Sequence, residues 1–257
     1  MEWINQFPAF LLIFVRVLAF FTTMPIFAYR NVPNTFKIGL AVFMAFTMMF
    51  TVDVPELAIN AEYFLLVIKE ALVGLLVGLV ASMLIYAVQV AGMFIDILMG
   101  FLVANVIDPQ TGAQSPLTGG FLYAFTVLFL LAVDGHHLLL DGVYYSYEFV
   151  PLEQLFLPFG NGSIAYFALT TFTTMFIIAF QMAFPIIGCL FLVDVALGMM
   201  SRAVPQMNVF VVGLPLKIFL GLPLLAIMLP GFFSLVSYTF EEAGTAMRTL
   251  LELFGGA

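Results

Sequence analysis

Charge is the scarcest property of this sequence. Its 257 residues include seven basic and 15 acidic side chains, so 9% of the chain is charged, against about 25% in soluble domains. Hydrophobic residues reach 64%, and the mean hydropathy is +1.17. A soluble globule must expose much of its residue set to water. The composition therefore excludes a soluble fold and predicts an all-α, membrane-type protein, because helices satisfy their own backbone hydrogen bonds in hydrocarbon.

Cysteine and clustered basic residues are also missing. The one cysteine, Cys189, lies in an apolar run, so an intrachain disulfide is excluded and the thiol is expected to behave as a small hydrophobic side chain. The basic residues form no patch, which excludes a nucleic-acid partner, since phosphate binding needs grouped Lys and Arg. The first residues lack a basic region and a small-residue cleavage site, so we expect the first helix to remain in the protein.

The sequence has none of the common catalytic motifs: no phosphate-binding glycine loop, no nucleophile elbow and no zinc pattern. His136 and His137 are adjacent, and neighbouring helical side chains point about 100° apart. The pair is therefore expected to be a poor metal site, and a polar cluster at a helix end or a proton-responsive contact is favoured. We predict no catalytic residue, no metal, no cofactor and no enzymatic activity.

Apolar segments separated by short polar turns make up the rest of the chain. We expect six to eight helices in broken hairpins. Pro185 is expected to kink or end the helix that contains it, and Pro215, Pro223 and Pro230 to bend or interrupt the last apolar run. The acidic stretch that contains Asp141, Glu148 and Glu153, with Pro151 and Pro158, is expected to be broken and interfacial. Tyr144, Tyr145 and Tyr147 are its expected anchors. The expected segments are 7–29, 38–52, 63–104, 117–133, a helix after 163, 218–240 and a short amphipathic helix over 241–257.

One long segment, 63–104, carries small and polar residues at helical spacing. Such a stripe lets the backbones of two helices approach closely, and Gly92 is a plausible bend. Two interpretations stay open, a helix-packing face and the lining of a pathway. The stripe consists of Glu70, Gly74, Gly78, Ser82, Gln89, Gly92, Asp96 and Gly100.

Ionisable residues inside apolar segments are costly and usually have a partner. Asp194 and Arg202 are eight positions apart on one helix, about 80° around it, and cannot reach each other. Each is expected to find its partner elsewhere, in this chain or in another. We predict inter-helix or inter-subunit polar contacts for Arg16, Asp96, Asp194, Arg202, Gln206, Asn208 and Lys217.

Several short motifs occur in order along the chain. They are Gly92-Met-Phe-Ile-Asp96-Ile-Leu-Met-Gly100-Phe101, Asp108-Pro109, Asp134-Gly135-His136, Arg202-x-x-Pro205-Gln206-Met207-Asn208-Val209 and Gly213-Leu-Pro215-Leu-Lys217. In these motifs, dispersed over about residues 7–240, the chain resembles the FliR family of flagellar type III export-gate membrane proteins (FliR/SctT-like). It departs from the family pattern after Asp96, where Ile97-Leu98 stand in place of a polar residue.

The resemblance implies a core subunit that forms, with FliP-like and FliQ-like subunits, the channel for unfolded flagellar proteins, beside FlhA-like and FlhB-like proteins. It implies a single domain, 1–257, with a FliP-like part over 1–162 and a FliQ-like part over 163–257. The location implied is the bacterial inner membrane, as a multi-pass protein of the flagellar basal body. Two alternatives remain, a subunit of a virulence injectisome and a stand-alone secondary transporter or channel. A loop that plugs the closed channel would include Asp108, Pro109, Gln110 and Gly112.

Overall fold

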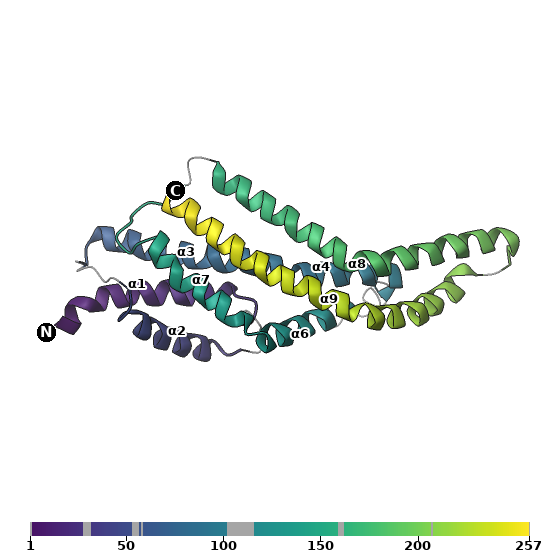
Figure 1. Ribbon diagram of the computed structural model, residues 1–257, viewed down its shortest axis with the longest axis horizontal. Helices are drawn as coiled ribbons and strands as arrows, with labels where there is room; N and C mark the ends of the chain where they lie inside the picture. Colours follow the sequence, from purple (N-terminus) through teal and green to yellow (C-terminus); the bar gives the residue numbers. More distant parts are fainter. Residues whose placement is uncertain are drawn as a thin grey trace. The chain divides into compact units, whose positions relative to one another are not determined.

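The chain is mainly helical in the part that the structure describes. The computed structural model describes residues 2–27, 32–52, 57, 59–101, 116–158, 162–206 and 208–256. These residues contain no strand, and the predicted all-α fold class is confirmed (Figure 1). The helices, in chain order, are α1 Glu2–Thr23, α2 Asn34–Met48, α3 Ala61–Ile85, α4 Ala87–Met99, α6 Leu117–Ala132, α7 Gly135–Phe149, α8 Ser163–Ala203 and α9 Val209–Gly255.

Among the described helices, four stretches are long and apolar enough to cross a membrane: Gln6–Thr23 of α1, Ala61–Met99 of α3 and α4, and all of α8 and α9. Helices α6 and α7 pass the same test only as a pair, broken between Ala132 and Gly135. Helix α2 has 15 residues, fewer than the about 20 that a perpendicular crossing needs. The protein is therefore a multi-pass membrane protein.

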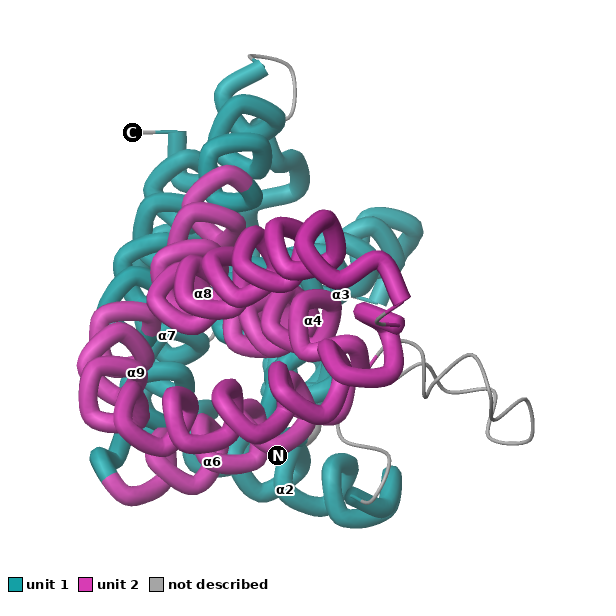
Figure 2. The backbone as a smooth tube through the Cα atoms, turned by 90° about the vertical axis from the view of Figure 1, so that its right-hand side faces the viewer, with its two compact units in different colours: residues 1–85, 133–172, 240–257 teal, residues 86–132, 173–239 magenta. Residues whose placement is uncertain are grey.

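The chain forms two compact units (Figure 2). Unit 1 comprises Met1–Ile85, Val133–Phe172 and Phe240–Ala257. In it α1 packs against α2 and α3, and α7 packs against α3. A Cβ atom at Gly74 would overlap the backbone carbonyl of Arg16, so α1 and α3 touch backbone to backbone. This half of the small-residue stripe is a packing face.

Unit 2 comprises Tyr86–Ala132 and Thr173–Thr239, and in it α4 packs against α6. A Cβ atom at Gly92 would overlap the backbone of Gly119, so glycines on both helices allow the contact. The rings of Tyr86 and Tyr123 stack with centroids 5.5 Å apart. The second half of the stripe therefore also packs against a helix of its own unit.

The bend expected at Gly92 is wrong. Helical structure from Ala61 is interrupted at Tyr86 instead, and α4 ends at Met99 with Gly100 in the left-handed conformation (φ 86°). A glycine in that conformation is a common way to end a helix. The helix therefore ends before residue 104, because Gly100 terminates it.

Other expectations about breaks are wrong in part: no proline interrupts its helix, whereas a kink or bend at these prolines stays a prediction. Helix α9 runs without interruption through Pro215, Pro223 and Pro230 and includes the tail that was expected to be a separate helix. Helix α8 continues through Pro185. The acidic stretch expected to be broken is regular helix α7 up to Phe149 and is not helical from Val150 to Pro158, so the break is confirmed in its second half. Apolar surroundings make any further lost backbone hydrogen bond expensive, so the neighbouring turns stay helical around each proline.

The predicted boundary between residues 162 and 163 coincides with the start of α8. The two compact units are divided differently, since unit 1 gathers segments from both sides of that boundary. The assignment of FliP-like and FliQ-like parts concerns likeness to other subunits, and it stays a prediction.

Candidate functional site

Arg16 lies in the middle of α1 among buried apolar neighbours and is itself 1% exposed. Ile13, Val17 and Phe20 share this buried face, so the helix cannot turn Arg16 outward without exposing them. The guanidinium instead reaches Glu70 on α3. Its Nε donates to one carboxylate oxygen, and its Nη2 donates to the other over 2.9 Å. This two-pronged geometry is the strong form of the arginine–carboxylate pair.

Further contacts complete the shell around Arg16. Its Nη1 donates to the Ser146 hydroxyl over 2.9 Å, and its Nη2 donates to the Val150 carbonyl over 2.8 Å. The guanidinium carbon lies 4.0 Å from the ring centre of Tyr147, a cation–π distance. Arg16 lies on α1, and its partners lie on α3, on α7 and just after α7. These contacts therefore hold the three helices together.

Lys69 adds a second cation to the same carboxylate. Its ammonium pairs with Glu70 and donates to the Pro151 carbonyl over 3.0 Å. Two buried cations thus share one buried anion, and backbone carbonyls after α7 balance the excess positive charge. We refer to Arg16, Lys69, Glu70, Ser146 and Tyr147 as the buried charge cluster. None of its members is more than 7% exposed, so the cluster holds helices together and is closed to a substrate.

Sequence reasoning identified Arg16 but missed its partners. Glu70 was assigned only to the packing stripe, and its neighbour Lys69 carried no prediction. The position of Glu70 in that stripe was the available signal. Tyr147 was expected to be an interfacial anchor, which is wrong, because its ring packs over Arg16; Tyr144 and Tyr145 are exposed.

Asp96 of α4 is fully buried and faces the start of α6. The backbone N–H of Thr118 lies 3.1 Å from both of its carboxylate oxygens. Helix N-termini leave unpaired N–H donors and carry partial positive charge. No basic side chain among the described residues pairs with Asp96. Its partner within the chain is a helix end.

The polar residues near the connection from α8 to α9 differ in their surroundings. Asp194 of α8 forms an ion pair with Lys217 of α9. The Asn208 side-chain oxygen accepts from the backbone N–H of Phe210 over 3.1 Å and caps α9. Arg202 and Gln206 are exposed, and Arg202 pairs with no acidic residue that the structure describes. Their predicted inter-subunit contacts remain predictions, and the plug residues Asp108, Pro109, Gln110 and Gly112 lie outside the described residues.

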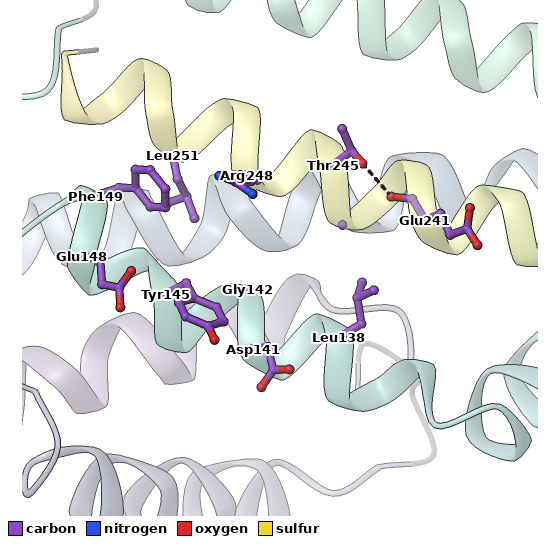
Figure 3. Close-up of a pocket in the computed structure, with 11 residues that line it drawn as sticks. Leu138, Asp141, Gly142, Tyr145, Glu148, Phe149, Glu241, Thr245, Arg248 and Leu251 are labelled. Carbon is purple, nitrogen blue, oxygen red and sulfur yellow. Dashed lines mark hydrogen bonds between the residues drawn. The ribbon is translucent and has the colours of Figure 1, made fainter.

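A groove of about 610 Å³ lies between α7 and the end of α9 in unit 1 (Figure 3). Glycines on both helices bring them together, since Gly142 faces Met247 and Gly244 faces Leu138. The groove has no nucleophile beside a base, and three carboxylates and one guanidinium lie around it. The charged residues are Asp141, Glu148, Glu241 and Arg248.

Large apolar side chains are exposed along α8 and α9. Leu192 is 67% exposed, Phe219 is 76% exposed and Ile227 is 67% exposed. Each helix has a most apolar window of 18 residues. In α8, 33% of that window is buried, and in α9, 17% is buried. Such faces need lipid or protein against them.

Comparison with known proteins gives consistent results over nearly the whole chain. Residues 7–243 match the family described as bacterial export proteins, family 1. The flagellar biosynthetic protein FliR of Bacillus subtilis is 54% identical over 253 residues, covering 98% of each chain. The protein of the same name from Pectobacterium carotovorum is 30% identical, over 97% of this chain and 94% of its own length. The one from Escherichia coli is 28% identical, over 94% of this chain and 92% of its own length.

Proposed function

The chain belongs to the bacterial export proteins, family 1, and is a flagellar biosynthesis export protein of the membrane; we propose that it is a core subunit of the flagellar type III export gate. In this proposal it forms, with FliP-like and FliQ-like subunits, the channel through which unfolded flagellar proteins leave the cell. FlhA-like and FlhB-like proteins are its neighbours, and the inner membrane is its location. It performs no chemical step of its own.

The observation that carries the proposal is the 54% identity over 98% of both chains to a protein named for flagellar biosynthesis. The apolar faces of α8 and α9 add physical support. These exposed faces leave room for neighbouring subunits. Helix α9 has 47 residues, and because a helix rises about 1.5 Å per residue, it is longer than a bilayer is thick.

The residues at 108–112 take the role of a plug in this proposal. The plug closes the channel in the absence of an exported chain and moves aside for it. This assignment rests on the resemblance of the sequence alone.

Two measurements test the proposal. A deletion strain should lose swimming, and the full chain expressed in it should restore it. The chain, extracted in mild detergent with an affinity tag, should migrate as a large complex that contains different small membrane proteins. A deletion strain that swims normally would favour the injectisome alternative. A monomer or homodimer that moves a solute into liposomes would favour the transporter alternative.

A further inference from the structure

We propose that Asp134, His136 and His137 form a binding site for a zinc ion at the start of α7. The candidate ligand atoms of these three residues all lie within 4.8 Å of one another. Nδ1 of His137 is 3.9 Å from the Asp134 carboxylate, and the two imidazole centroids are 4.1 Å apart. From the sequence alone, the two adjacent side chains are expected to point about 100° apart around the helix. The structure brings both rings to one side of the first turn.

His136 supplies an independent observation. Its Nδ1 atom is buried, and it has no hydrogen-bond partner among the described residues. Burying an imidazole nitrogen without a hydrogen-bond partner lowers the stability of the fold. A hydrogen bond or a bound metal ion would recover that stability. In a neutral imidazole one ring nitrogen is a lone-pair acceptor, which is the atom that a metal ion binds.

The Asp134 carboxylate is also available. Asp134 occupies the N-cap position of α7, where aspartate normally bonds to the backbone of the first turn, yet its side chain makes no capping hydrogen bond. Its backbone is left-handed, with φ 56°. A helix N-terminus disfavours a cation, so this carboxylate, which makes no capping hydrogen bond, supplies the negative charge that a zinc ion there requires.

The donor set decides the chemical class of the ion. Two imidazoles and one carboxylate are typical of zinc and its transition-metal neighbours, whereas calcium and magnesium prefer oxygen alone. Zinc ligands about 2.0–2.2 Å from the ion are roughly 3.4 Å apart in a tetrahedron. The side chains of Asp134 and His137 are 76% and 65% exposed, so both can rotate by the small amount needed. The fourth position is then open to water or to a donor from another chain.

A bound ion would have a structural effect on the turn. It would join the residue before α7 to the first turn of α7, and so fix the direction in which the helix begins. This role needs no catalysis and does not depend on the export function.

Histidine-specific measurements report on this cluster alone, because the sequence has two histidines and both belong to the cluster. The full-length protein, purified in detergent with a tag free of histidine, is stripped with a chelator and titrated with Zn²⁺ by calorimetry, with retained metal counted by mass spectrometry. We expect one zinc ion per chain. Diethyl pyrocarbonate should modify both imidazoles of the stripped protein and be blocked by zinc.

Matched variants give the test its control. His137→Gln changes an exposed side chain, so it keeps the fold, and we expect it to weaken zinc binding at least tenfold, since even partners of metal ligands contribute about 10–100-fold. Asp134→Asn keeps a residue that tolerates the left-handed backbone and should also weaken binding. Glu148→Gln, on the exposed side of α7 away from the cluster, should bind zinc like the unchanged chain. Zinc binding weaker than about 0.1 mM, or equal binding by His137→Gln, would overturn the proposal.

Discussion

Arg16 and Glu70 are 54 residues apart in the sequence and form a two-pronged ion pair inside unit 1. The pair joins α1 to α3 where α7 also arrives, and Lys69 adds a second cation to the same carboxylate. One anion therefore supports two buried cations. Because of this imbalance, substitution of Glu70 should lower the free energy of unfolding more than substitution of any other member of the buried charge cluster.

Glu70→Gln should destabilise unit 1 strongly. It leaves two buried cations without their anion, and breaking a buried pair from one side costs about 3–5 kcal/mol. Thermal unfolding of the detergent-purified chain measures this cost. Lys69→Met is the matched comparison, because it leaves a balanced Arg16–Glu70 pair, and it should cost about 1–2 kcal/mol. Equal losses in the two variants would contradict the imbalance.

The exposed pair of Arg248 and Glu252 offers a baseline for that measurement. Arg248 Nε lies 3.0 Å from the Glu252 carboxylate, with both side chains largely in solvent. Exposed pairs of this spacing contribute about 0.3–0.5 kcal/mol. Arg248→Gln should therefore leave the unfolding temperature nearly unchanged.

Asp96→Ala should loosen the start of α6. The carboxylate accepts from the first turn of that helix, and loss of a side-chain cap costs about 0.5–2 kcal/mol. Asp96→Asn keeps one acceptor oxygen and should cost less. Protease cleavage near residue 117, followed by mass spectrometry, reports the fraying directly. Identical cleavage in the two variants and the unchanged chain would rule out the capping role.

Gly92→Ala should separate α4 from α6. The added Cβ would overlap the backbone of Gly119, and backbone cannot step aside as a flexible side chain does, so we expect a loss of about 1–3 kcal/mol. Gly188→Ala is the control, because a Cβ there meets nothing within 4 Å. Unfolding temperatures of the isolated chain should fall for the first variant alone.

Swapping the charges of Asp194 and Lys217 together should impair the protein less than reversing either charge alone. Asp194→Lys puts two like charges together, and Lys217→Asp does the same with the opposite sign, whereas the double variant restores an attractive pair. Swimming radius in the complemented deletion strain and the yield of the extracted complex measure the effect. A double variant no better than the worse single variant would show that the two residues act separately.

Shortening the segment 108–114 tests the proposed plug. The channel should still assemble, since the deletion touches neither the buried charge cluster nor the contact of α4 with α6. The membrane should leak small molecules, which entry of a normally excluded dye measures. Full assembly with unchanged permeability would remove the plug assignment and leave the export assignment standing.

The sequence predicted composition-driven features well. The all-helical membrane class followed from the scarcity of charge, and the segment expected over 117–133 is helix α6, Leu117–Ala132. Arg16 was recognisable as a lone cation in an apolar run. Its pairing with Glu70 was not, because helical spacing gives the face on which a residue lies but not the helix that it meets.

Local rules failed where the surroundings outweigh them. Three prolines suggested a bent or interrupted helix, and the interruption is wrong because α9 is continuous. A proline removes one hydrogen bond, whereas breaking the helix in apolar surroundings would remove several. The two histidine rings lie closer together than the average side-chain directions on a helix suggest, with centroids 4.1 Å apart, whereas the expectation of a poor metal site is untested.

The exposed apolar faces of α8 and α9 have a consequence for the life of the protein in the cell. A newly made chain carries surfaces that water does not tolerate, and lipid or neighbouring subunits must cover them soon after synthesis. A copy left without them exposes the features that membrane proteases and chaperones recognise. Its abundance is therefore expected to follow that of its neighbours, and overproduction of this chain alone should end in degradation or aggregation, not in a surplus of free subunits.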